Sequence, residues 1–317
     1  MKKIKLILKY IYLFLLPLFI LSSCNNNSNK IDETPTRGNI KISVDDSYKL
    51  IIESQVYTFE SFYKYAKINA IYKTEAEALN DFLNDSIRTI IVSKKLSKEQ
   101  EADLKSKQII VRTTKIAIDA VCFVVNKTNT DTNILYSEIG NIFKGELTNW
   151  KSINKNNKLG DINVVFDNNG SSNVSYIQNK FNITKFPNYC FSANSNAEVI
   201  DYVESHKNAI GLISASWLSD KHDSTSNNFL SRVKVVGVSS CNAMKEDDPD
   251  YSKPYQAYIA DGSYPLTRDV YAICRESFAG LGSGFISFIA GDKGQRIILK
   301  SGIVPGTMPV RLVQVKR

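Results

Sequence analysis

Short apolar runs alternate with segments of helical periodicity along most of this chain, and the alternation limits the folds open to it. We expect strands at residues 39–44, 67–72, 87–92, 116–126, 162–166, 209–213, 233–238 and 268–274. Helices are expected from Ser47 onward and at 74–84, 97–106, 136–144, 174–181, 196–205, 284–290 and 294–300. Strands that alternate with helices predict α/β domains with mostly parallel sheets and helices on both faces.

Hydroxyl residues mark several of the expected helix starts. Thr74 and Ser97 are each followed three residues later by Glu or Gln, which is the spacing of a capping box. Ser47 is placed to cap the first helix. The polar segments 219–231 and 241–263 are expected to be loops.

The composition excludes several classes of function. The chain has only two histidines, His206 and His222, and its five cysteines include no C-x-x-C pair, so we expect no metal site and no cofactor. The sequence also lacks the G-x-S-x-G motif of many hydrolases, so we do not expect an enzyme. The formal charge of +8 falls to +4 without the first 23 residues, and no basic run is interleaved with aromatics. Nucleic acid is therefore not an expected partner.

The first 24 residues have the layout of a bacterial export signal. Four lysines precede the apolar run 10–21, which has the length of a signal-peptide core and is short for a bilayer span. The run ends at Leu21-Ser22-Ser23-Cys24, which resembles a lipobox, so residues 1–23 are interpreted as a signal peptide and Cys24 as a lipidation site. A short transmembrane anchor with an incidental cysteine is the alternative. Residues 24–37 are polar and non-periodic and are interpreted as a tether.

Two loops at expected strand-to-helix junctions have the residues of an anion site. Segments 46–48 and 170–173 place hydroxyls at helix starts, where unpaired N–H groups and the positive end of the dipole favour an anion. Ser93 follows a strand in the same way, and the carboxyl ends of parallel strands converge. The alternative is that the serines only cap their helices. Asp119 is the one charged residue inside the apolar run 116–126, which is expected to be buried.

A series of short motifs follows one another in a fixed order after residue 38. They are Ser47-Tyr48, Ser93 to Ser97, Ile118 to Asn126, Phe143 to Trp150, Asp167 to Asn173, Ala209-Ile210-Gly211, Tyr264-Pro265-Leu266-Thr267-Arg268, Gly294-Gln295 and Gly302 to Pro305. In this order they resemble the PstS-like phosphate-binding proteins of ATP-driven importers, a group of the type II periplasmic binding proteins. The resemblance covers most of residues 38–310. It implies two α/β lobes joined by a hinge, one built from 38–119 plus 258–317 and the other from 120–257.

The resemblance also implies which residues bind the solute. They are Ser47, Tyr48, Ser93, Asp119, Asp167, Ser171, Ser172 and Asn173. Asp119 resembles the family carboxylate that accepts a proton from bound phosphate, and the alternative is a buried carboxylate held by backbone donors. Asp167 stands where the family has an arginine that clamps the phosphate, and Ser171-Ser172-Asn173 stands where it has Ser-Gly-Thr. For Asp167, a position facing solvent or capping a turn is the alternative to a binding role.

The resulting hypothesis is a monomeric, lipid-anchored, extracytoplasmic solute-binding protein. It would capture phosphate, or a related small polar solute, and deliver it to the permease of an ABC transporter. The alternative is a signalling or adaptor lipoprotein that keeps the fold with altered or lost anion binding, which Asp167 favours. The sequence leaves open whether Cys190 and Cys241 form a disulfide.

Overall fold

The computed structural model of the protein describes residues 33–245 and 248–310. The expected signal peptide (1–23), the lipidation site Cys24 and the tether up to residue 32 lie outside the described residues. Among the helices of the described part, none is long and apolar enough to cross a membrane.

Ten strands form one mixed sheet, and three more form a small second sheet. The large sheet has the order β2-β1-β3-β12-β4-β8-β6-β7, and β9 and β13 also pair with β4. Its strands are β1 (Gly38–Asp45), β2 (Ala66–Lys73), β3 (Thr89–Val92), β4 (Arg112–Asn126), β6 (Asn163–Phe166), β7 (Cys190–Ser192), β8 (Ala209–Ser214), β9 (Val233–Val235), β12 (Thr267–Cys274) and β13 (Val304–Pro305). The small sheet has the order β11-β10-β5 and consists of β5 (Asn133–Ile134), β10 (Gly237–Ser239) and β11 (Tyr251–Ser252).

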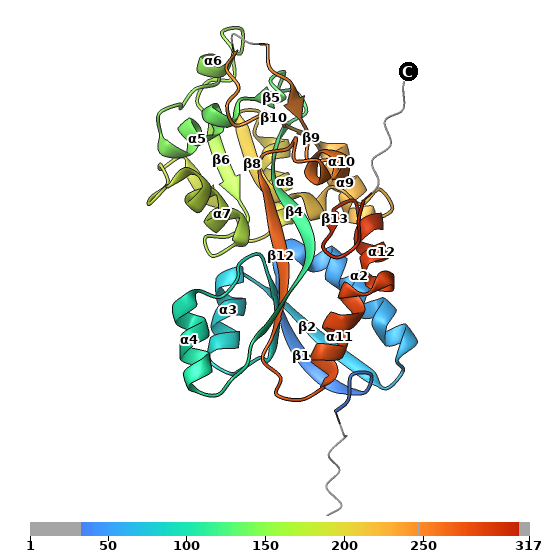
Figure 1. The fold of residues 1–317 in the computed structure, drawn as a ribbon. Coiled ribbons are helices and arrows are strands. Elements are labelled where there is room, and N and C mark those ends of the chain that lie inside the picture. The colour runs from blue at the N-terminus through green and yellow to red at the C-terminus, as the bar shows by residue number, and fades with distance from the viewer. Residues whose placement is uncertain (1–32, 246–247, 311–317) are drawn as a thin grey trace, which may run out of the picture. The chain divides into compact units, whose positions relative to one another are not determined.

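Strands β4 and β12 connect two lobes. The first half of β4, up to Ala120, pairs with β12, and the second half, from Val121, pairs with β8 and β9. Figure 1 shows both strands running from the lower lobe through the waist into the upper lobe. The two-lobed α/β fold is thus confirmed. The sheet is parallel only toward its two ends, because β4 and β12 are antiparallel to each other and to their other neighbours in the strand order, β8 and β3.

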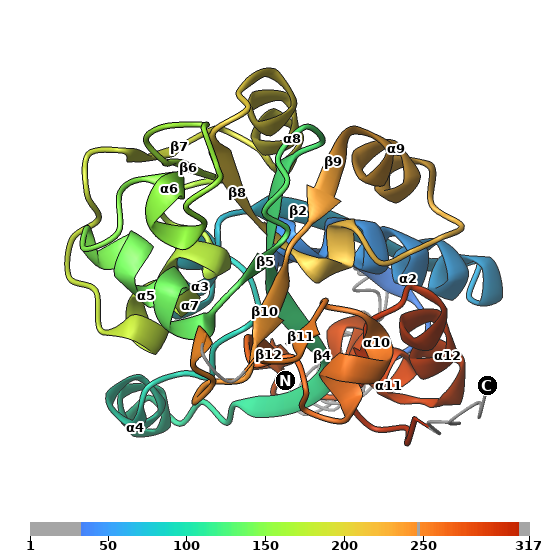
Figure 2. The ribbon, with the colours of Figure 1, turned by 90° about the horizontal axis from the view of Figure 1, so that it is seen from above.

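Helices cover both faces of the sheet in each lobe. In the lower lobe, one face carries α2 (Lys49–Phe62), α11 (Leu281–Ala290) and α12 (Asp292–Lys300), and the other carries α3 (Glu75–Leu83) and α4 (Lys98–Ser106) (Figure 1). Seen from above in Figure 2, α9 (Ser224–Arg232) and α10 (Gln256–Ala260) lie across the upper lobe from α5 (Tyr136–Lys144), α6 (Trp150–Ile153) and α7 (Ser172–Phe181). Helix α8 (Asn196–Ser205) packs on β8 and β4, and the short 3₁₀ helices are η2 (Asp46–Tyr48) and η3 (Ala215–Trp217).

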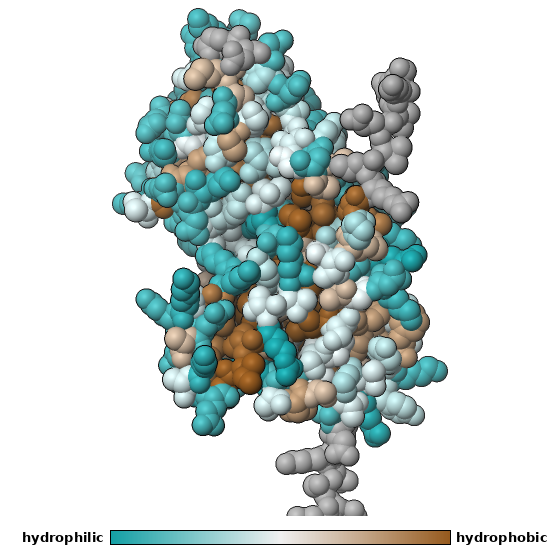
Figure 3. Space-filling view, viewed as in Figure 1, coloured by the Kyte–Doolittle hydropathy of each residue, from teal (hydrophilic) through white to brown (hydrophobic). Residues whose placement is uncertain are grey.

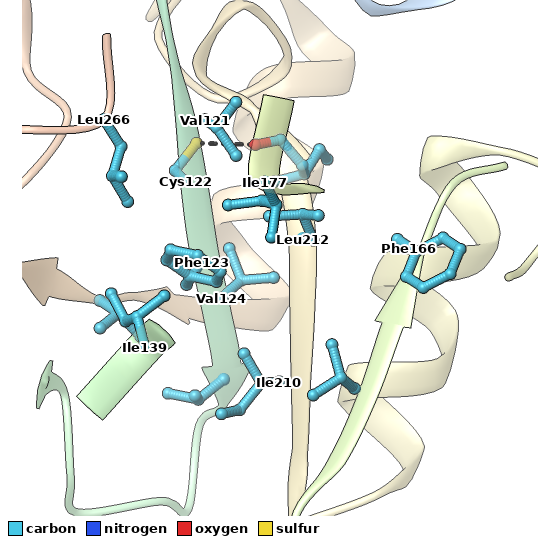
Figure 4. Close-up of a cluster of buried hydrophobic side chains, with 14 of the residues drawn as sticks. Val121, Cys122, Phe123, Val124, Ile139, Phe166, Ile177, Ile210, Leu212 and Leu266 are labelled. Carbon is cyan, nitrogen blue, oxygen red and sulfur yellow. Dashed lines mark hydrogen bonds between the residues drawn. The ribbon is translucent and has the colours of Figure 1, made fainter. Parts of the chain in front are cut away.

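Each lobe has its own apolar core. In the upper lobe, side chains from β4 meet those of β6, β8, α5 and α7, as Figure 4 shows for Phe123, Leu212 and Phe166. Cys122 is buried there, and its Sγ donates to the carbonyl of Ile213 at 3.2 Å. In the lower lobe, α2 and α11 cover one side of the sheet and α3 and α4 cover the other.

The two predicted capping boxes are confirmed, whereas Ser47 does not cap a helix. The side chains of Thr74 and Ser97 accept hydrogen bonds from the backbone three residues on, and both reciprocal contacts are formed. Ser47 lies inside η2 instead, and its own N–H donates to the Asp45 carboxylate at 3.1 Å. Helix α2 then begins after Tyr48 without a side-chain cap.

Two segments expected as loops contain regular structure. Segment 219–231 holds most of α9, and 241–263 holds β11 and α10. Helix α9 has few strong helix formers and is held by the burial of Phe229, whose ring stacks on Trp217 at a centroid distance of 5.9 Å. The run 233–238, expected as one strand, is divided between two sheets: β9 pairs with β4, and β10 pairs with β5 and β11.

The last residues of the expected tether are attached to the lower lobe. The Glu33 carboxylate accepts hydrogen bonds from the Arg88 guanidinium at 3.0 Å and from the Leu281 N–H at 3.2 Å. Residues 33–37 are therefore part of the folded lobe, and the tether interpretation is wrong for them. Figure 3 shows that hydrophilic side chains cover most of one face, with a few separate apolar areas on the lower lobe and beside the waist.

We predict that Phe123→Ala lowers the free energy of unfolding by about 3–5 kcal/mol, because it leaves a cavity in a packed core. Phe123 is 1% exposed. Tyr57→Ala is the control and should change stability by less than about 0.5 kcal/mol, because Tyr57 is 77% exposed. Urea denaturation of the three proteins tests this. Equal midpoints for Phe123→Ala and the wild type would contradict the packing described here.

Candidate functional site

The end of β1 turns sharply into the first helices, and this turn supplies one side of the site. Asp45 is the last residue of β1, and its Oδ1 accepts from the N–H of Ser47. This contact is an Asx turn, in which a carboxylate satisfies a backbone donor two residues on. It buries Ser47 and Tyr48 side by side at the waist, each 1% exposed.

The loop from β6 to α7 supplies the facing side. The Asn168 side chain accepts from the N–H of Gly170 at 3.1 Å, and Ser171 caps α7 by accepting from the N–H of Val174 at 3.2 Å. Since Ser171 does the capping, the hydroxyl of Ser172 is left to contact groups outside its own helix. Ser172 is fully buried.

A buried ion pair lies at the centre of the site. Arg268 of β12 stands directly opposite Asp119 of β4 in the antiparallel register. Its Nε and Nη2 donate to Asp119 Oδ2 at 3.1 and 3.0 Å. Both side chains are almost completely buried, at 3% and 0% exposed. The guanidinium also lies over the ring of Tyr48, 5.5 Å from its centroid.

Ser172 links the two sides of the site. Its hydroxyl accepts from Arg268 Nη1 at 3.0 Å and lies 3.0 Å from the hydroxyl of Ser47. Residues from η2, α7 and β12 thus meet at one oxygen atom. On the opposite side, the hydroxyl of Ser216 donates to the carbonyl of Ser47, and the hydroxyl of Ser214 donates to Asp119 at 2.7 Å.

Further hydrogen bonds around this centre join elements of the lower lobe to elements of the upper lobe. The N–H of Ala76 donates to the carbonyl of Gly170 at 3.2 Å. The hydroxyl of Ser175 donates to Glu75 at 3.2 Å, and another such contact joins Asn196 to Asp46 at 3.0 Å. Glycine at 170 eases the close approach of the Ala76 and Gly170 backbones. A Cβ on Gly170 would lie 3.2 Å from the Oγ1 of Thr74, a tight contact.

Ser93 is turned away from Arg268. Both its N–H and its hydroxyl donate to Glu75 Oε1, at 2.8 and 2.6 Å. Glu75 is 1% exposed, and Lys94 lies 3.6 Å from its Oε2. Ser93 therefore fixes a carboxylate of the site and makes no described contact with the serines at the centre.

Burial governs the protonation of the site. It raises the pKa of Asp45 to about 7, with the nearby charge of Glu75 adding to the rise and Arg268 and Ser172 opposing it. Burial also raises the pKa of Asp167, against the hydrogen bonds of the loop and the charge of Arg268. Burial alone would lower the pKa of Arg268, but Tyr48, Asp119, Asp45 and Glu75 hold it above its usual range. The guanidinium is therefore charged at every physiological pH.

Several buried acceptor atoms near the centre have no hydrogen-bond partner among the described residues. They are Asp45 Oδ2, Asp167 Oδ1, Asn173 Oδ1 and Asn196 Oδ1, and the hydroxyl of Tyr48 is likewise unpartnered. The other oxygen of Asp167 accepts from Asn173 Nδ2 at 3.2 Å. Buried oxygens of this kind ordinarily accept a hydrogen bond from the protein, from water or from a ligand.

The structure brings together Ser47, Tyr48, Asp119 and Ser172 from the expected set. Asp167 and Asn173 form a buried pair in the β6–α7 loop, so a solvent-facing Asp167 is excluded. Ser171 is a helix cap. Sequence reasoning missed three groups, Asp45, Glu75 and Arg268, as well as the two serines of the β8–η3 turn.

A signal for Arg268 was present. Alternate residues of a strand share one face, and Arg268 shares its face with Val270, which belongs to the lower core. An arginine on the buried face of a strand requires a buried acceptor. The sequence offers Asp119 for this role, because it is the carboxylate within the apolar run 116–126. Asp45 and Glu75 carried no such signal, because each is a polar residue at the border of an element.

The sequence matches the PBP superfamily domain over residues 31–293, most of the chain. The chain belongs to the PBP superfamily. Among curated proteins it is similar to the phosphate-binding protein PstS of Staphylococcus aureus (strain USA300), with 23% identity over 280 residues, 87% of this chain and 81% of the relative.

Solved structures agree with this family at the level of the fold. A putative phosphate ABC transporter substrate-binding protein from Clostridium perfringens, solved with bound phosphate, superposes with a TM-score of 0.69 and 20% identity over 84% of this chain and 99% of that one. An ABC-type phosphate transport receptor from Vibrio cholerae superposes with a TM-score of 0.64 and 19% identity. The match covers 84% of this chain and 100% of that one. These likenesses establish the fold.

We predict that the free energy of unfolding decreases as the pH rises from about 4 to about 7. Between the usual Asp pKa of 3.8 and the value of about 7 in the fold, the folded state holds a proton on Asp45 that the unfolded state has released. The stabilisation from Asp45 is therefore complete below pH 3.8 and is lost as the pH rises through about 7. Urea denaturation at the two ends of the range measures the slope.

Asp45→Asn should flatten that slope. Asp269→Asn is the matched control, because Asp269 carries the same charge in a half-exposed pair with Lys115 at 2.6 Å. An unchanged slope in Asp45→Asn would show that other groups govern the pH dependence.

Proposed function

We propose that this protein is an extracytoplasmic solute-binding protein of an ABC importer that captures phosphate, or a closely related small oxyanion, between its two lobes. The observation that carries the proposal is the convergence of Ser47, Ser172 and Arg268. The Ser172 hydroxyl contacts a buried, permanently charged guanidinium on one side and the Ser47 hydroxyl on the other. Charged and neutral donors that surround one point are the means by which proteins bind oxyanions.

The start of α7 adds to these donors. The first N–H groups of a helix have no partner within it, and the dipole places positive charge at that end. Ser172 and Asn173 are the first two residues of α7 and are fully buried against the centre of the site. The S. aureus relative and the C. perfringens and V. cholerae proteins are named for phosphate, which supports the same class of solute.

The proposed binding residues are those expected from the sequence, with a changed role for Ser93. Ser47, Tyr48, Asp119, Asp167, Ser171, Ser172 and Asn173 would line the cleft, and Ser93 would act through Glu75. The expected lobes, 38–119 plus 258–317 and 120–257, would change at one boundary, because Ile259, Tyr264 and Leu266 belong to the upper core. Strands β4 and β12 would cross between the lobes. Binding would shift the protein toward the closed arrangement, and no bond of the solute would be made or broken.

The proposed location is the outer face of a membrane. The basic start, the apolar run 10–21 and Cys24 support export followed by lipidation. Acyl chains on Cys24 would hold the monomer at the membrane, each buried methylene contributing about 0.8 kcal/mol. The anchored protein would then present its solute to the permease.

A second candidate is a signalling or adaptor lipoprotein that keeps the fold but not the affinity for anions. Two observations favour it. Asp167 occupies the position of the family arginine, and the donors at the centre already bond to one another and to Asp119. A solute must displace the Ser47–Ser172 contact, which lowers the affinity by the cost of breaking it.

We predict that titration calorimetry detects phosphate binding and that Ser172→Ala weakens it by at least about 1 kcal/mol, about fivefold. The loss arises because the Ser172 hydroxyl, which this proposal places against the phosphate, is removed from a fully buried position. Ser54→Ala is the control, because the Ser54 hydroxyl bonds only to the carbonyl of Leu50 within the exposed face of α2. Absence of phosphate binding by the wild type would favour the adaptor function instead.

The anchor is tested separately. We predict that mass spectrometry of the membrane fraction of expressing cells finds an acylated Cys24 as the first residue, and that Cys24→Ala releases the protein from that fraction. An intact peptide that begins at Met1 in the mature pool would contradict the lipid anchor and favour a retained transmembrane segment.

A further inference from the structure

The foot of the lower lobe lies at the edge of the sheet farthest from the waist. Strands β1, β2 and β3 begin at this edge, and β12 ends there opposite the start of β4. Figure 1 shows the starts of β1 and α11 at this end of the molecule. Its exposed part, which we call the basal surface, consists of segments 33–38, 63–66, 84–88, 107–112 and 275–281. The basal surface therefore lies on the opposite side of the lobe from the proposed solute site.

Three large apolar side chains of the basal surface are exposed to solvent. Tyr65, Ile110 and Phe278 are 77%, 75% and 42% exposed. A guanidinium lies over each of the two rings, and both Arg37 over Tyr65 and Arg88 over Phe278 are 5.5 Å from the ring centroid. Exposed rings beside long basic side chains are typical of a surface at a membrane–water interface, where the ring enters the headgroup layer and the charge stays in water.

A cavity of about 320 Å³ in the basal surface is lined by arginines. Arg88 and Arg112 line it beside Ile110, and Arg275, whose side chain is 6% exposed, forms part of its wall. A guanidinium offers paired N–H donors that match the oxygens of a phosphate group. The cavity therefore has suitable donors for a lipid phosphate.

Positive charge is in excess on the basal surface. Its segments contain six cations and three carboxylates, Arg37, Lys64, Arg88, Lys107, Arg112 and Arg275 against Glu33, Asp85 and Glu276. Each carboxylate already has a partner, which is an arginine in two cases and the first N–H groups of α11 in the third. Lys107 is paired with Asp103 of α4 at 2.8 Å. Among the described residues, Arg37, Lys64 and Arg112 are exposed and belong to no ion pair.

Glu33, the first described residue, lies within the basal surface. Its carboxylate accepts from the Arg88 guanidinium and from the N–H of Leu281. Nine residues of chain lead from Cys24 to Glu33, and nine residues span at most about 30 Å when fully extended. A lipid on Cys24 would therefore keep this end of the lower lobe within about 30 Å of the membrane.

We propose that the basal surface binds the surface of an anionic phospholipid membrane. Tyr65, Ile110 and Phe278 enter the headgroup layer, and the exposed cations beside them contact lipid phosphates. The inference rests on the proposed lipid anchor and goes beyond it, because an anchor alone leaves the orientation of the folded protein free. The basal contact fixes that orientation, with the lower lobe against the membrane and the upper lobe pointing away from it.

A weak contact is sufficient for this role. The anchor holds the basal surface within reach of the bilayer, so the contact forms within one attached molecule and needs little affinity of its own. The attraction between exposed charges is screened beyond about 8 Å at physiological ionic strength, so it acts only on cations close to the headgroups. The contact should therefore require anionic lipid and weaken in concentrated salt.

The test uses the full-length lipidated protein, purified from the membrane fraction and placed in vesicles of phosphatidylglycerol and brominated phosphatidylcholine. Tyr65→Trp and Phe278→Trp each add a fluorescent ring to the basal surface, and bromine on the acyl chains quenches a ring that enters the bilayer. We expect each variant to lose about half of the added fluorescence relative to vesicles without bromine, because rings at such a surface lie about 5–10 Å deep. The native Trp150 and Trp217 are 0% and 7% exposed in the upper lobe and give a constant background.

Tyr258→Trp is the matched control. Tyr258 is 41% exposed on α10 of the upper lobe, so its replacement should stay unquenched in the same vesicles. Salt at about 1 M, where the screening length falls to about 3 Å, should reduce the quenching of Tyr65→Trp severalfold, and vesicles without phosphatidylglycerol should have the same effect.

Charge variants assign the contact to the cations. Lys64→Gln combined with Arg112→Gln should reduce the quenching of Phe278→Trp severalfold, because both cations are exposed on the basal surface. Lys155→Gln combined with Lys158→Gln removes the same charge from exposed positions of the upper lobe and should leave the quenching unchanged.

The possible failures are distinguishable. Protein that floats with the vesicles but is unquenched at both basal positions, or is quenched equally at Tyr258→Trp, would contradict the inference and leave the anchor in place. Protein that does not float with the vesicles would overturn the anchor and the inference together. Quenching that persists in the basal charge variants, or on vesicles without anionic lipid, would contradict recognition of anionic lipid.

Discussion

The ion pair between Arg268 and Asp119 is the contact around which the waist of the protein is built. The two residues face each other on β12 and β4, the strands that run through both lobes, so the pair is held by the backbone register. Removal of one partner from such a buried pair generally costs about 3–5 kcal/mol, because the other charge is left without compensation. The ring of Tyr48 and the serines of the β8–η3 turn pack around this pair. The loops that carry Ser47 and Ser172 then meet at the free side of the guanidinium.

The sequence predicts elements well where the signal is local. The capping boxes of Thr74 and Ser97 form as expected, because each involves only residues within one turn. The Ser47 cap fails because Asp45, two residues earlier, takes the N–H of Ser47 into an Asx turn. Helix α9 has weak intrinsic propensity and depends on Phe229 reaching Trp217, a contact that no local pattern reveals. The division of 233–238 between two sheets is likewise decided by distant strands.

The same distinction applies to the site. The loops of Ser47, Ser93 and Ser172 were expected to converge, because each follows an expected strand, and the family resemblance placed Asp119 with them. Ser93 instead donates to Glu75. The partners of Asp119 and Ser47 come from residues 95 or more positions away, namely Ser214 and Ser172. Arg268 was placed on a strand but not assigned to the site, although its position on the buried face called for an acceptor. Asp45 and Glu75 become significant only once burial removes them from water.

The backbone contact between Ala76 and Gly170 bears on how a protein of this kind can change its solute. It joins a carbonyl from the β6–α7 loop to an N–H at the start of α3, at a position where a Cβ would lie 3.2 Å from the Oγ1 of Thr74. Side chains of the same segment also join the lobes, Ser172 to Ser47 and Ser175 to Glu75, so the contact does not depend on one bond. The hydrogen bond of Asp167, in contrast, stays within its own loop. Under the proposed function, a substitution at 167 would change the charge offered to the solute and leave the bonds that join the lobes in place.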